Sequence, residues 1–371
     1  MRLPKYKQTF EQLDQLMQEG TYKLVLWGRN QKTRELCKRY AVAYIVDEND
    51  ELCDLKVGGA QIFRPAKLYG EKPEKTIVVI CDHEAYPEIT AELDRIGDFV
   101  IFYSSPLFSG FLGNVSTELW DAYGEIQRVK DSLADDMSKK ILQECVVRRI
   151  CGCERGYRDL KVENEIQYLY RPAFLSKREG TILDIGGYTG NSVDRFVNAY
   201  GDDIKEIDSF EALPENVKSI EQKREELKAY WHGTLRIFPY AVADAHQELV
   251  FHETENKDAC FAPDFRETVK FFSTKPVREF KVEAVAIDEI LPVDRKVRLI
   301  KMDIEGAEYA ALLGAKKTIQ REKPGLAISI YHNPKDYYRL ADLIRSYVPE
   351  YNLAVRHHKD RHVDTVLYAW V

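Results

Sequence analysis

Short apolar runs alternate with helix-like stretches along most of this chain. In the first hundred residues, the apolar runs lie at 22–27, 41–46, 76–81 and 99–103, and the helix-like stretches lie at 33–40 and 87–96. Strands that are joined through helices usually run parallel in one sheet. The pattern therefore predicts a small α/β domain with four strands, a turn at Gly58–Gly59 and a closing loop at 106–113.

The same alternation returns at residue 181, after a stretch from about 115 to 170 that has helical spacing and no strand pattern. Strands are predicted at 181–185, 204–210, 235–242, 297–302, 326–331, 352–355 and 363–370, with helices at 191–200, 214–230 and 307–320. The last two strands resemble a hairpin. We therefore expect an α/β fold with a doubly wound sheet of seven strands, mostly parallel with an antiparallel end.

A chain of 371 residues exceeds one ordinary core, so we expect several parts. Residues 1–112 would form a smaller N-terminal Rossmann-like α/β domain, 113–170 a helical connector, and 171–371 the second α/β domain. Between 251 and 280, phenylalanines alternate irregularly with charges. That segment is interpreted either as a lid over a substrate or as an insertion with its own small core, and its phenylalanines include Phe261, Phe265, Phe271 and Phe272.

Composition excludes several classes of function. Lys and Arg total 54 against 61 Asp and Glu, and a net charge of −7 argues against a nucleic-acid partner. No window approaches the roughly 18 apolar residues that a membrane span needs. The first residues show no apolar signal segment, so we expect a cytoplasmic protein. The seven scattered cysteines do not form a disulfide framework, and the spacing of Cys151-Gly-Cys153 is not that of a zinc site.

The most informative local pattern is a glycine loop at 184–190, with the sequence DIGGYTG. It follows a predicted strand and begins a predicted helix, so Gly186 and Gly190 would let the backbone approach a ligand at the helix N-terminus. The carboxylate of Asp184 would repel a diphosphate but suits a ligand with an ammonium group. The GxGxxG spacing of dinucleotide folds is absent. These features favour an amino-acid-bearing nucleoside over NAD.

Two further acidic residues follow the next strands. Glu211 ends the second strand, where a carboxylate can accept hydrogen bonds from both ribose hydroxyls. Asp244 follows the third strand and could accept from the amino group of a purine. Because the carboxyl ends of parallel strands meet at one edge of a sheet, Asp184, Glu211 and Asp244 predict one nucleoside site.

Several motifs in order then identify a family. They are DIGGYTG, SFEALPEN, AVAD, IDEIL, LIKMDIEGAEYAALLGA and LAISIYHNP, and they extend over more than half of the chain, from about residue 168 to 371. This series resembles the S-adenosylmethionine-dependent methyltransferases of the FkbM family. The block around 301–308 is the most specific part. The family's fold is a doubly wound class I methyltransferase sheet with a final antiparallel strand.

The resemblance implies roles for particular residues. Asp184, Gly186 and Gly190 would hold the methionine end of S-adenosylmethionine, Glu211 the ribose and Asp244 the adenine. Asp303 would lie where methyl donor and acceptor meet. The sequence departs from the family's Glu-Pro pair, because two residues separate Glu211 from Pro214, and this departure leaves the contacts around Leu213 open.

Transfer of an activated methyl group needs alignment and, for a hydroxyl acceptor, help in removing a proton. Asp303 and His332 each lie just beyond a predicted strand and are the candidate bases. Glu305 and Glu308 suit the first turn of a helix, where acidic residues are favoured. We assign no metal, although Asp303, Glu305 and the nearby histidines have the ligand chemistry of several divalent ions.

Two regions remain open. Residues 356–358 (Arg-His-His) could hold an anionic or sugar acceptor, or Arg356 could be a surface residue. In the N-terminal part, Gly28-Arg29-Asn30 and Asp47 resemble a Rossmann-like domain of surface-sugar enzymes but keep one glycine of the fingerprint. That part could bind a nucleotide-sugar, or serve packing or homo-oligomer contacts, as could the helical connector.

The sequence therefore predicts an O-methyltransferase that acts on a hydroxyl of a sugar or surface-glycan precursor, the sugar being an inference from the family and the N-terminal part. A non-catalytic module that binds a nucleoside or nucleotide-sugar is the first alternative. A nucleotide-dependent oxidoreductase using the N-terminal part is the second, and the incomplete glycine fingerprint argues against it.

Overall fold

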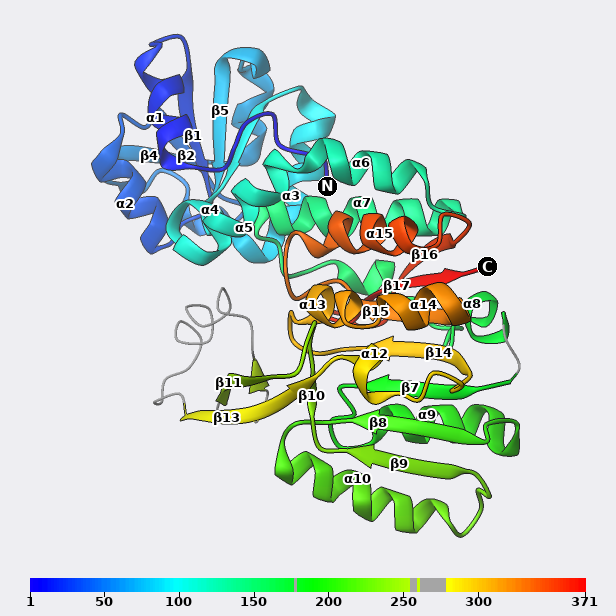
Figure 1. Ribbon diagram of the computed structural model, residues 1–371. Coiled ribbons are helices and arrows are strands. Elements are labelled where there is room, and N and C mark those ends of the chain that lie inside the picture. The colour runs from blue at the N-terminus through cyan, green and yellow to red at the C-terminus, as the bar shows by residue number, and fades with distance from the viewer. Residues whose placement is uncertain (177–178, 254–258, 261–277) are drawn as a thin grey trace. The chain divides into compact units, whose positions relative to one another are not determined.

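The computed structural model describes residues 1–176, 179–253, 259–260 and 278–371 (Figure 1). The chain forms two compact units. Unit 1 comprises Met1–Gln127, Leu142–Leu160 and Lys359–His362, and unit 2 comprises Arg128–Ile141, Lys161–His358 and Val363–Val371. The stretch expected to be a connector contributes residues to both units, and the boundaries after residues 112 and 170 stay predictions.

Unit 1 contains a six-stranded sheet in the order β3-β4-β2-β1-β5-β6, in which β3 alone is antiparallel to its neighbour. The strands are β1 (Lys23–Trp27), β2 (Tyr44–Val46), β3 (Lys56–Val57), β4 (Ala60–Phe63), β5 (Thr76–Ile80) and β6 (Val100–Tyr103). The four predicted strands are all present. The predicted turn Gly58–Gly59 joins the two short additional strands, β3 and β4.

The helices of unit 1 are α1 (Phe10–Gln18), α2 (Gln31–Arg39), α3 (Tyr86–Ile96), α4 (Ser104–Phe108) and α5 (Gly110–Asp121). The loop predicted at 106–113 was wrong, because α4 and the start of α5 occupy it. Ser109 caps α5 by accepting from the Leu112 amide, and Pro106 lies in the first turn of α4, where no N–H is needed. The helices α6 (Tyr123–Asp131) and α7 (Asp136–Cys151) contribute to both units.

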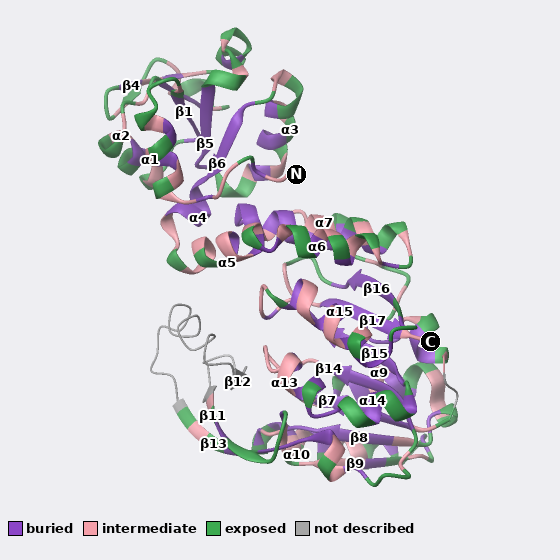
Figure 2. Ribbon diagram, turned by 45° about the horizontal axis from the view of Figure 1, so that its top comes forward, coloured by how far each residue is buried: buried purple, intermediate pink, exposed green. Residues whose placement is uncertain are grey.

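Unit 2 contains a seven-stranded sheet in the order β16-β17-β15-β14-β7-β8-β9. The strands are β7 (Thr181–Ile185), β8 (Glu206–Phe210), β9 (Thr234–Phe238), β14 (Val297–Met302), β15 (Gly325–Ser329), β16 (Asn352–His357) and β17 (Thr365–Trp370). In this sheet β17 runs in the direction opposite to the other six strands. Every residue of β7, β14 and β15 is buried, as a parallel strand covered on both faces requires (Figure 2). The predicted doubly wound sheet is confirmed.

The helices of unit 2 are α8 (Arg171–Leu175), α9 (Asn191–Tyr200), α10 (Pro214–Leu227), α12 (Ile287–Ile290), α13 (Glu308–Leu313), α14 (Lys316–Glu322) and α15 (Asp336–Tyr347). The strand predicted at 235–242 is divided into β9 and β10 (Ala241–Val242), with Pro239, which has no N–H for a sheet, between them. The helix predicted at 307–320 is divided at Gly314. A Cβ there would lie 2.1 Å from the Ala243 carbonyl oxygen.

A second, smaller sheet in unit 2 has the order β10-β13-β11-β12, with β11 (Gln247–Glu253), β12 (Ala259–Cys260) and β13 (Arg278–Val285). The antiparallel pair β11–β13 extends away from the main sheet (Figure 1). A cluster of Ala243, Leu249, Val282 and Ala284 is buried at its base. This supports an insertion with its own small core, whereas the four phenylalanines Phe261, Phe265, Phe271 and Phe272 lie outside the described residues.

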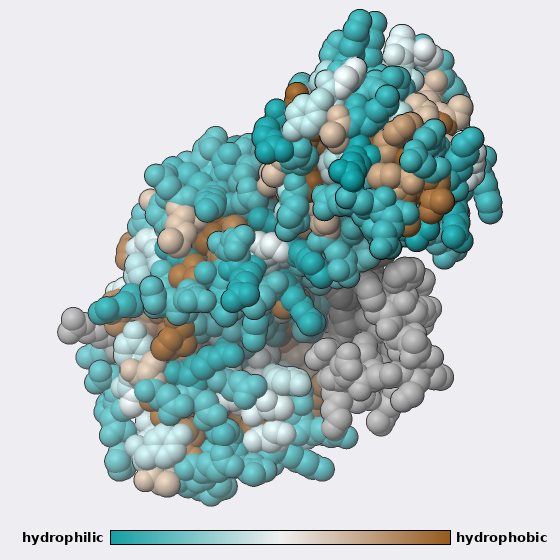
Figure 3. All heavy atoms as spheres, turned by 180° about the vertical axis from the view of Figure 1, so that it is seen from behind, coloured by the Kyte–Doolittle hydropathy of each residue, from teal (hydrophilic) through white to brown (hydrophobic). Residues whose placement is uncertain are grey.

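Within the described part of the chain, no helix is long and apolar enough to cross a membrane. On the face drawn in Figure 3, apolar atoms form small patches among hydrophilic ones. Among the residues that the structure describes, six cysteines form no disulfide, namely Cys37, Cys53, Cys81, Cys145, Cys151 and Cys153.

Candidate functional site

A cavity of about 350 Å³ lies in unit 2, where β7, β8 and β14 end. The size is typical of a small-molecule site, and the carboxyl ends of parallel strands are where open α/β sheets bind ligands. Its wall includes the glycine loop, the turn after β8, the start of β11 and the turn after β14. The residues that line it include Gln167, Tyr168, Gly186, Tyr188, Arg195, Glu211, Leu213, Val242, Leu249, Lys301, Asp303, Glu305 and Asp364.

The predicted glycine loop forms one wall of the cavity. Gly186 has φ +80°, and a Cβ there would lie 2.0 Å from the Asp303 carbonyl oxygen, so this position requires glycine. Gly190, with φ +87°, is the N-cap of α9 and does not line the cavity. Gly186 therefore lies where the sequence analysis expected it, while Gly190 shapes the turn into the helix.

Asp184 lies behind this wall rather than in it. Its carboxylate is fully buried, accepts from the hydroxyls of Ser192 and Ser209, and pairs with Lys301 Nζ at 3.1 Å. Lys301, directly beside Asp184 on β14, also donates to the Gly186 carbonyl. Asp184 therefore orients Lys301, which in turn holds the glycine loop at the Gly186 carbonyl. Asp184 itself does not line the cavity.

Glu211 lies at the cavity, immediately after β8. Its two carboxylate oxygens accept from the backbone amides of Tyr188 at 2.8 Å and of Leu213 at 2.9 Å, and the residue is 8% exposed. Burial raises the pKa of Glu211, and these two amides partly oppose that shift. The longer turn before Pro214 therefore supplies one of the donors that orient the carboxylate.

Asp244 does not line the cavity. It is exposed and accepts from the side chain of Gln247 at 2.8 Å. In its neighbourhood the cavity wall is apolar, formed by Val242 and Leu249. The purine contact expected from Asp244 is not provided by this arrangement.

Asp303 lines the cavity beyond the loop, and two tyrosines hold it. The Tyr168 hydroxyl donates to Oδ2 at 2.8 Å and the Tyr331 hydroxyl to Oδ1 at 3.2 Å. Burial alone would raise the pKa of Asp303, but His332 and Lys301 outweigh it and hold the pKa below its usual value. Asp303 is therefore ionised and fixed in orientation.

His332 is buried behind Asp303 and does not line the cavity. Its Nδ1 lies 2.8 Å from Glu308 Oε1, and its Nε2 lies 3.2 Å from Glu305 Oε2 and 3.7 Å from Asp303 Oδ1. Burial opposes a charge on the ring, but Glu308 and Glu305 raise the pKa of His332 well above its usual value. In this arrangement His332 is a donor rather than a base.

Four residues around the cavity have left-handed backbone conformations, which residues other than glycine rarely adopt. They are Tyr168 (φ +69°), Tyr188 (φ +48°), Glu305 (φ +54°) and Asp364 (φ +62°). The described residues contain two other such positions. Strained backbone concentrates at functional sites, where surrounding contacts maintain it. The distribution supports this cavity as the candidate functional site independently of the residue types.

The sequence analysis missed three of the polar residues that line the cavity. Gln167, Arg195 and Asp364 do so, and Arg195 donates to Gln167 Oε1 at 2.7 Å. Arg195 lies in the second turn of the helix after the glycine loop, a position that could have drawn attention to it. Gln167 and Asp364 are far away in sequence and follow no motif.

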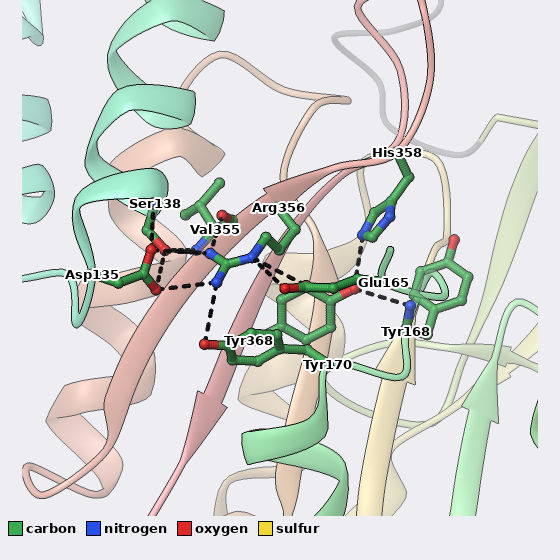
Figure 4. Close-up of polar contacts among 9 residues, drawn as sticks. All are labelled: Asp135, Ser138, Glu165, Tyr168, Tyr170, Val355, Arg356, His358 and Tyr368. Carbon is green, nitrogen blue, oxygen red and sulfur yellow. Dashed lines mark hydrogen bonds and ion pairs between the residues drawn. The ribbon is translucent and has the colours of Figure 1, made fainter. Parts of the chain in front are cut away.

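Residues 356–358 have a structural role. Arg356 is buried, pairs with Asp135 and Glu165, and lies over the Tyr170 ring (Figure 4). It is neither a surface residue nor available to an acceptor, so both earlier interpretations were wrong. Beside this cluster, the Tyr368 hydroxyl accepts from the Tyr168 amide and lies 3.0 Å from His358 Nε2.

Comparison with known proteins gives a family match for part of the chain. Residues 184–354 match the family model described as the methyltransferase FkbM domain. This part of the chain is similar to FkbM methyltransferase domains. The FkbM resemblance seen in the sequence is thereby confirmed, and with it a methyltransferase, whereas the Rossmann-like character of unit 1 stays a prediction.

One solved structure agrees with the fold of this chain, and a second has only a weak similarity. The crystal structure of methyltransferase FkbM from Methylobacillus flagellatus KT is 18% identical with a TM-score of 0.55, covering 96% of this chain and 93% of that one. A putative O-methyltransferase from Klebsiella pneumoniae is 12% identical with a TM-score of 0.32, covering 64% of this chain and 90% of that one. No curated protein matches the sequence.

Proposed function

We propose that the chain is an S-adenosylmethionine-dependent O-methyltransferase that methylates a hydroxyl of a sugar or surface-glycan precursor. The observation that carries this proposal is the carboxylate of Glu211, which two backbone amides, one of them from the glycine loop, hold at the cavity. A carboxylate at the end of the second strand suits a ribose diol.

The other residues of the cavity fit the rest of the cofactor. Val242 and Leu249 offer an apolar surface next to Glu211, which suits a purine ring. At the glycine loop, Arg195 supplies a cation that would bind the carboxylate of the methionine end. S-adenosylmethionine supplies a methyl group on a sulfonium, which is already activated for transfer.

Asp303 is the residue that we propose contacts the acceptor hydroxyl and takes its proton. The two tyrosine hydroxyls hold its carboxylate in place, so its contribution is orientation together with general-base catalysis of typically 10² to 10⁴-fold. The lowered pKa of Asp303 makes it a weak base, so orientation is the larger part. His332, which lies behind it, is a positioning residue.

Three carboxylates at this end of the cavity support a sugar acceptor. Asp303, Glu305 and Asp364 all line the wall. Ionised carboxylates accept several hydrogen bonds each, which suits a neutral acceptor that carries several hydroxyls and disfavours an anionic one. A cytoplasmic location and self-association through unit 1 or the connector stay predictions.

Calorimetric titration with S-adenosylhomocysteine tests the cofactor site. Glu211→Ala should bind at least about tenfold more weakly than the native protein, because hydrogen bonds to a charged group contribute about 1.5–3 kcal/mol each. Glu221→Gln, which removes an exposed carboxylate on the following helix α10, is the matched control and should bind as the native protein does. Equal affinity of the native and Glu211→Ala proteins would remove Glu211 from the site.

A methyl-transfer assay separates the enzyme from a binding module. The native protein, supplied with radiolabelled S-adenosylmethionine and a panel of glycans and sugar nucleotides, should label at least one acceptor, and Asp303→Asn should label it far more slowly. Binding without label on any acceptor would favour the non-catalytic module.

A further inference from the structure

We propose that a divalent metal ion binds between His332 Nε2, Asp303 Oδ1 and Glu305 Oε2, at the wall of the cavity. The three residues come from the ends of neighbouring strands. Asp303 and Glu305 follow β14 directly, His332 follows β15, and these two strands pair in parallel. The register of the sheet therefore brings one imidazole and two carboxylates to the same point.

The distances suit one small ion. His332 Nε2 lies 3.2 Å from Glu305 Oε2 and 3.7 Å from Asp303 Oδ1. In an octahedral site with bonds of about 2.1 Å, neighbouring ligand atoms lie about 3.0 Å apart. Asp303, Glu308 and His332 each offer a ligand atom within 4.8 Å of the others. Glu305, whose carboxylate lies 3.2 Å from His332 Nε2, would have to rotate its partly exposed side chain to join Asp303 at one ion.

The buried ring nitrogen gives an independent reason. His332 is 4% exposed, and its Nε2 has no hydrogen-bond partner among the described residues, although it faces two carboxylates. On the other side of the ring, Nδ1 is held by Glu308 Oε1 at 2.8 Å. A carboxylate that accepts from one ring nitrogen orients the other toward a metal, which is the usual arrangement around metal-binding histidines. A bound ion would replace the proton that Nε2 otherwise directs toward Glu305.

Charge favours the same conclusion. Asp303, Glu305 and Glu308 surround the ring, while the nearby Lys301 is already bonded to Asp184. Glu308 is fully buried and Asp303 largely so, and such carboxylates need a compensating charge. A second proton on His332 would supply one positive charge, and a divalent ion supplies two. Imidazole together with carboxylates is a ligand set for ions such as Mn²⁺.

If the proposed function holds, the ion has a role in it. An ion bound by Asp303 and Glu305 would face the cavity, where it could hold an acceptor hydroxyl and favour loss of its proton. This role rests on the proposed function, whereas the binding site itself does not.

The experiment is a titration of the protein with Mn²⁺, followed by electron paramagnetic resonance of the free ion, without cofactor or acceptor. The native protein should bind one Mn²⁺ per chain saturably. Asp303→Asn and His332→Gln should each bind at least about tenfold more weakly, because each removes a ligand atom. Glu289→Gln removes an exposed carboxylate outside the cluster and should bind as the native protein does.

Absence of saturable binding by the native protein, or binding as tight as the native protein's by Asp303→Asn and His332→Gln, would overturn the proposal. Circular dichroism checks that the variants fold. If His332→Gln fails to fold, Glu305→Gln, which lies on a partly exposed turn, takes its place. The result is independent of the cofactor titration. A protein that fails to bind S-adenosylhomocysteine can still bind Mn²⁺, and a protein that fails to bind Mn²⁺ can still bind S-adenosylhomocysteine.

Discussion

At the scale of single residues, the strained backbone around the cavity is the most informative observation. Tyr168, Tyr188, Glu305 and Asp364 come from four separate turns, yet all adopt the left-handed conformation at one cavity. A side chain in this conformation costs about 1–2 kcal/mol, so the hydrogen bonds around these residues must maintain it. Tyr188, for example, donates its amide to Glu211.

Tyr188 allows a direct test of strain. Tyr188→Gly should be more stable than Tyr188→Ala by about 0.5–1 kcal/mol, the reverse of the usual order within regular structure, because glycine relieves the left-handed strain. Both variants lose the same partly exposed ring, so their difference isolates the backbone. Thermal and urea denaturation of the two proteins measure it. A more stable alanine variant would contradict the assignment of strain.

His358 provides a pH-dependent prediction. Burial lowers the pKa of His358 to about 3, with His357, Arg195 and Arg356 adding repulsion, so the ring is neutral when folded. The unfolded ring, with a pKa of about 6.5, takes up a proton as the pH falls. Stability should therefore decline below about pH 6.5 by up to 1.4 kcal/mol per pH unit from this residue. Denaturation midpoints of native and His358→Gln proteins between pH 4.5 and 8 would show a shallower decline in the variant.

At the scale of elements, the parts next to the glycine loop were predictable because their signals are local. Helix α9 begins and ends where the sequence indicated, and α10 begins at Pro214 as predicted. The failures have a different cause. The division into α13 and α14 at Gly314 depends on the Ala243 carbonyl, 71 residues earlier in the chain, and no local pattern shows that contact.

Gly314 is therefore a position where a small substitution should have a large effect. In Gly314→Ala the new methyl would meet the Ala243 carbonyl oxygen, so we expect a loss of about 1–3 kcal/mol and a displaced β10. Gly124→Ala, in helix α6, has no atom near its Cβ and should be neutral or stabilising by up to about 1 kcal/mol. Melting temperatures measure both. Equal effects would show that the close approach at Gly314 is not restrictive.

The Arg356 cluster holds three segments of unit 2 together, namely the turn before α7, the loop at Glu165 and strand β16. Removing one partner from a buried ion pair leaves the others uncompensated and costs about 3–5 kcal/mol. Arg356→Met should therefore destabilise the protein strongly, whereas Arg171→Met, at an exposed position, should not. Urea denaturation distinguishes them, and similar midpoints would contradict a structural role for Arg356.

At the scale of the whole molecule, the sequence predicted the two sheets and part of the cavity. Gly186, Glu211 and Asp303 were found because they end strands, and strand ends meet at one edge. Asp184 could not be placed, because every residue of a strand covered on both faces is buried and its sequence does not show which side chains reach a ligand. Gln167 and Asp364 could not be found, because only the folded chain brings them to the cavity.

All residues that line the cavity belong to unit 2. We therefore expect a bound ligand to stabilise elements of unit 2. A ligand that binds the folded state slows local opening of the elements it contacts. Saturating S-adenosylhomocysteine should therefore slow amide hydrogen exchange in β7, β8 and β14 and leave β1 and β5 of unit 1 unchanged. Exchange measured by mass spectrometry tests this, and slowing confined to unit 1 would place the ligand elsewhere.

Tyr168 is anchored at both ends, by Tyr368 at its amide and by Asp303 at its hydroxyl. Tyr368 is the fourth residue from the end of this sequence and belongs to the strand inserted antiparallel between β15 and β16. Deleting residues 368–371 would remove the Tyr368 hydroxyl that accepts from the Tyr168 amide. Tyr168 would then hold the Asp303 carboxylate, more than sixty residues before the deleted end, less firmly.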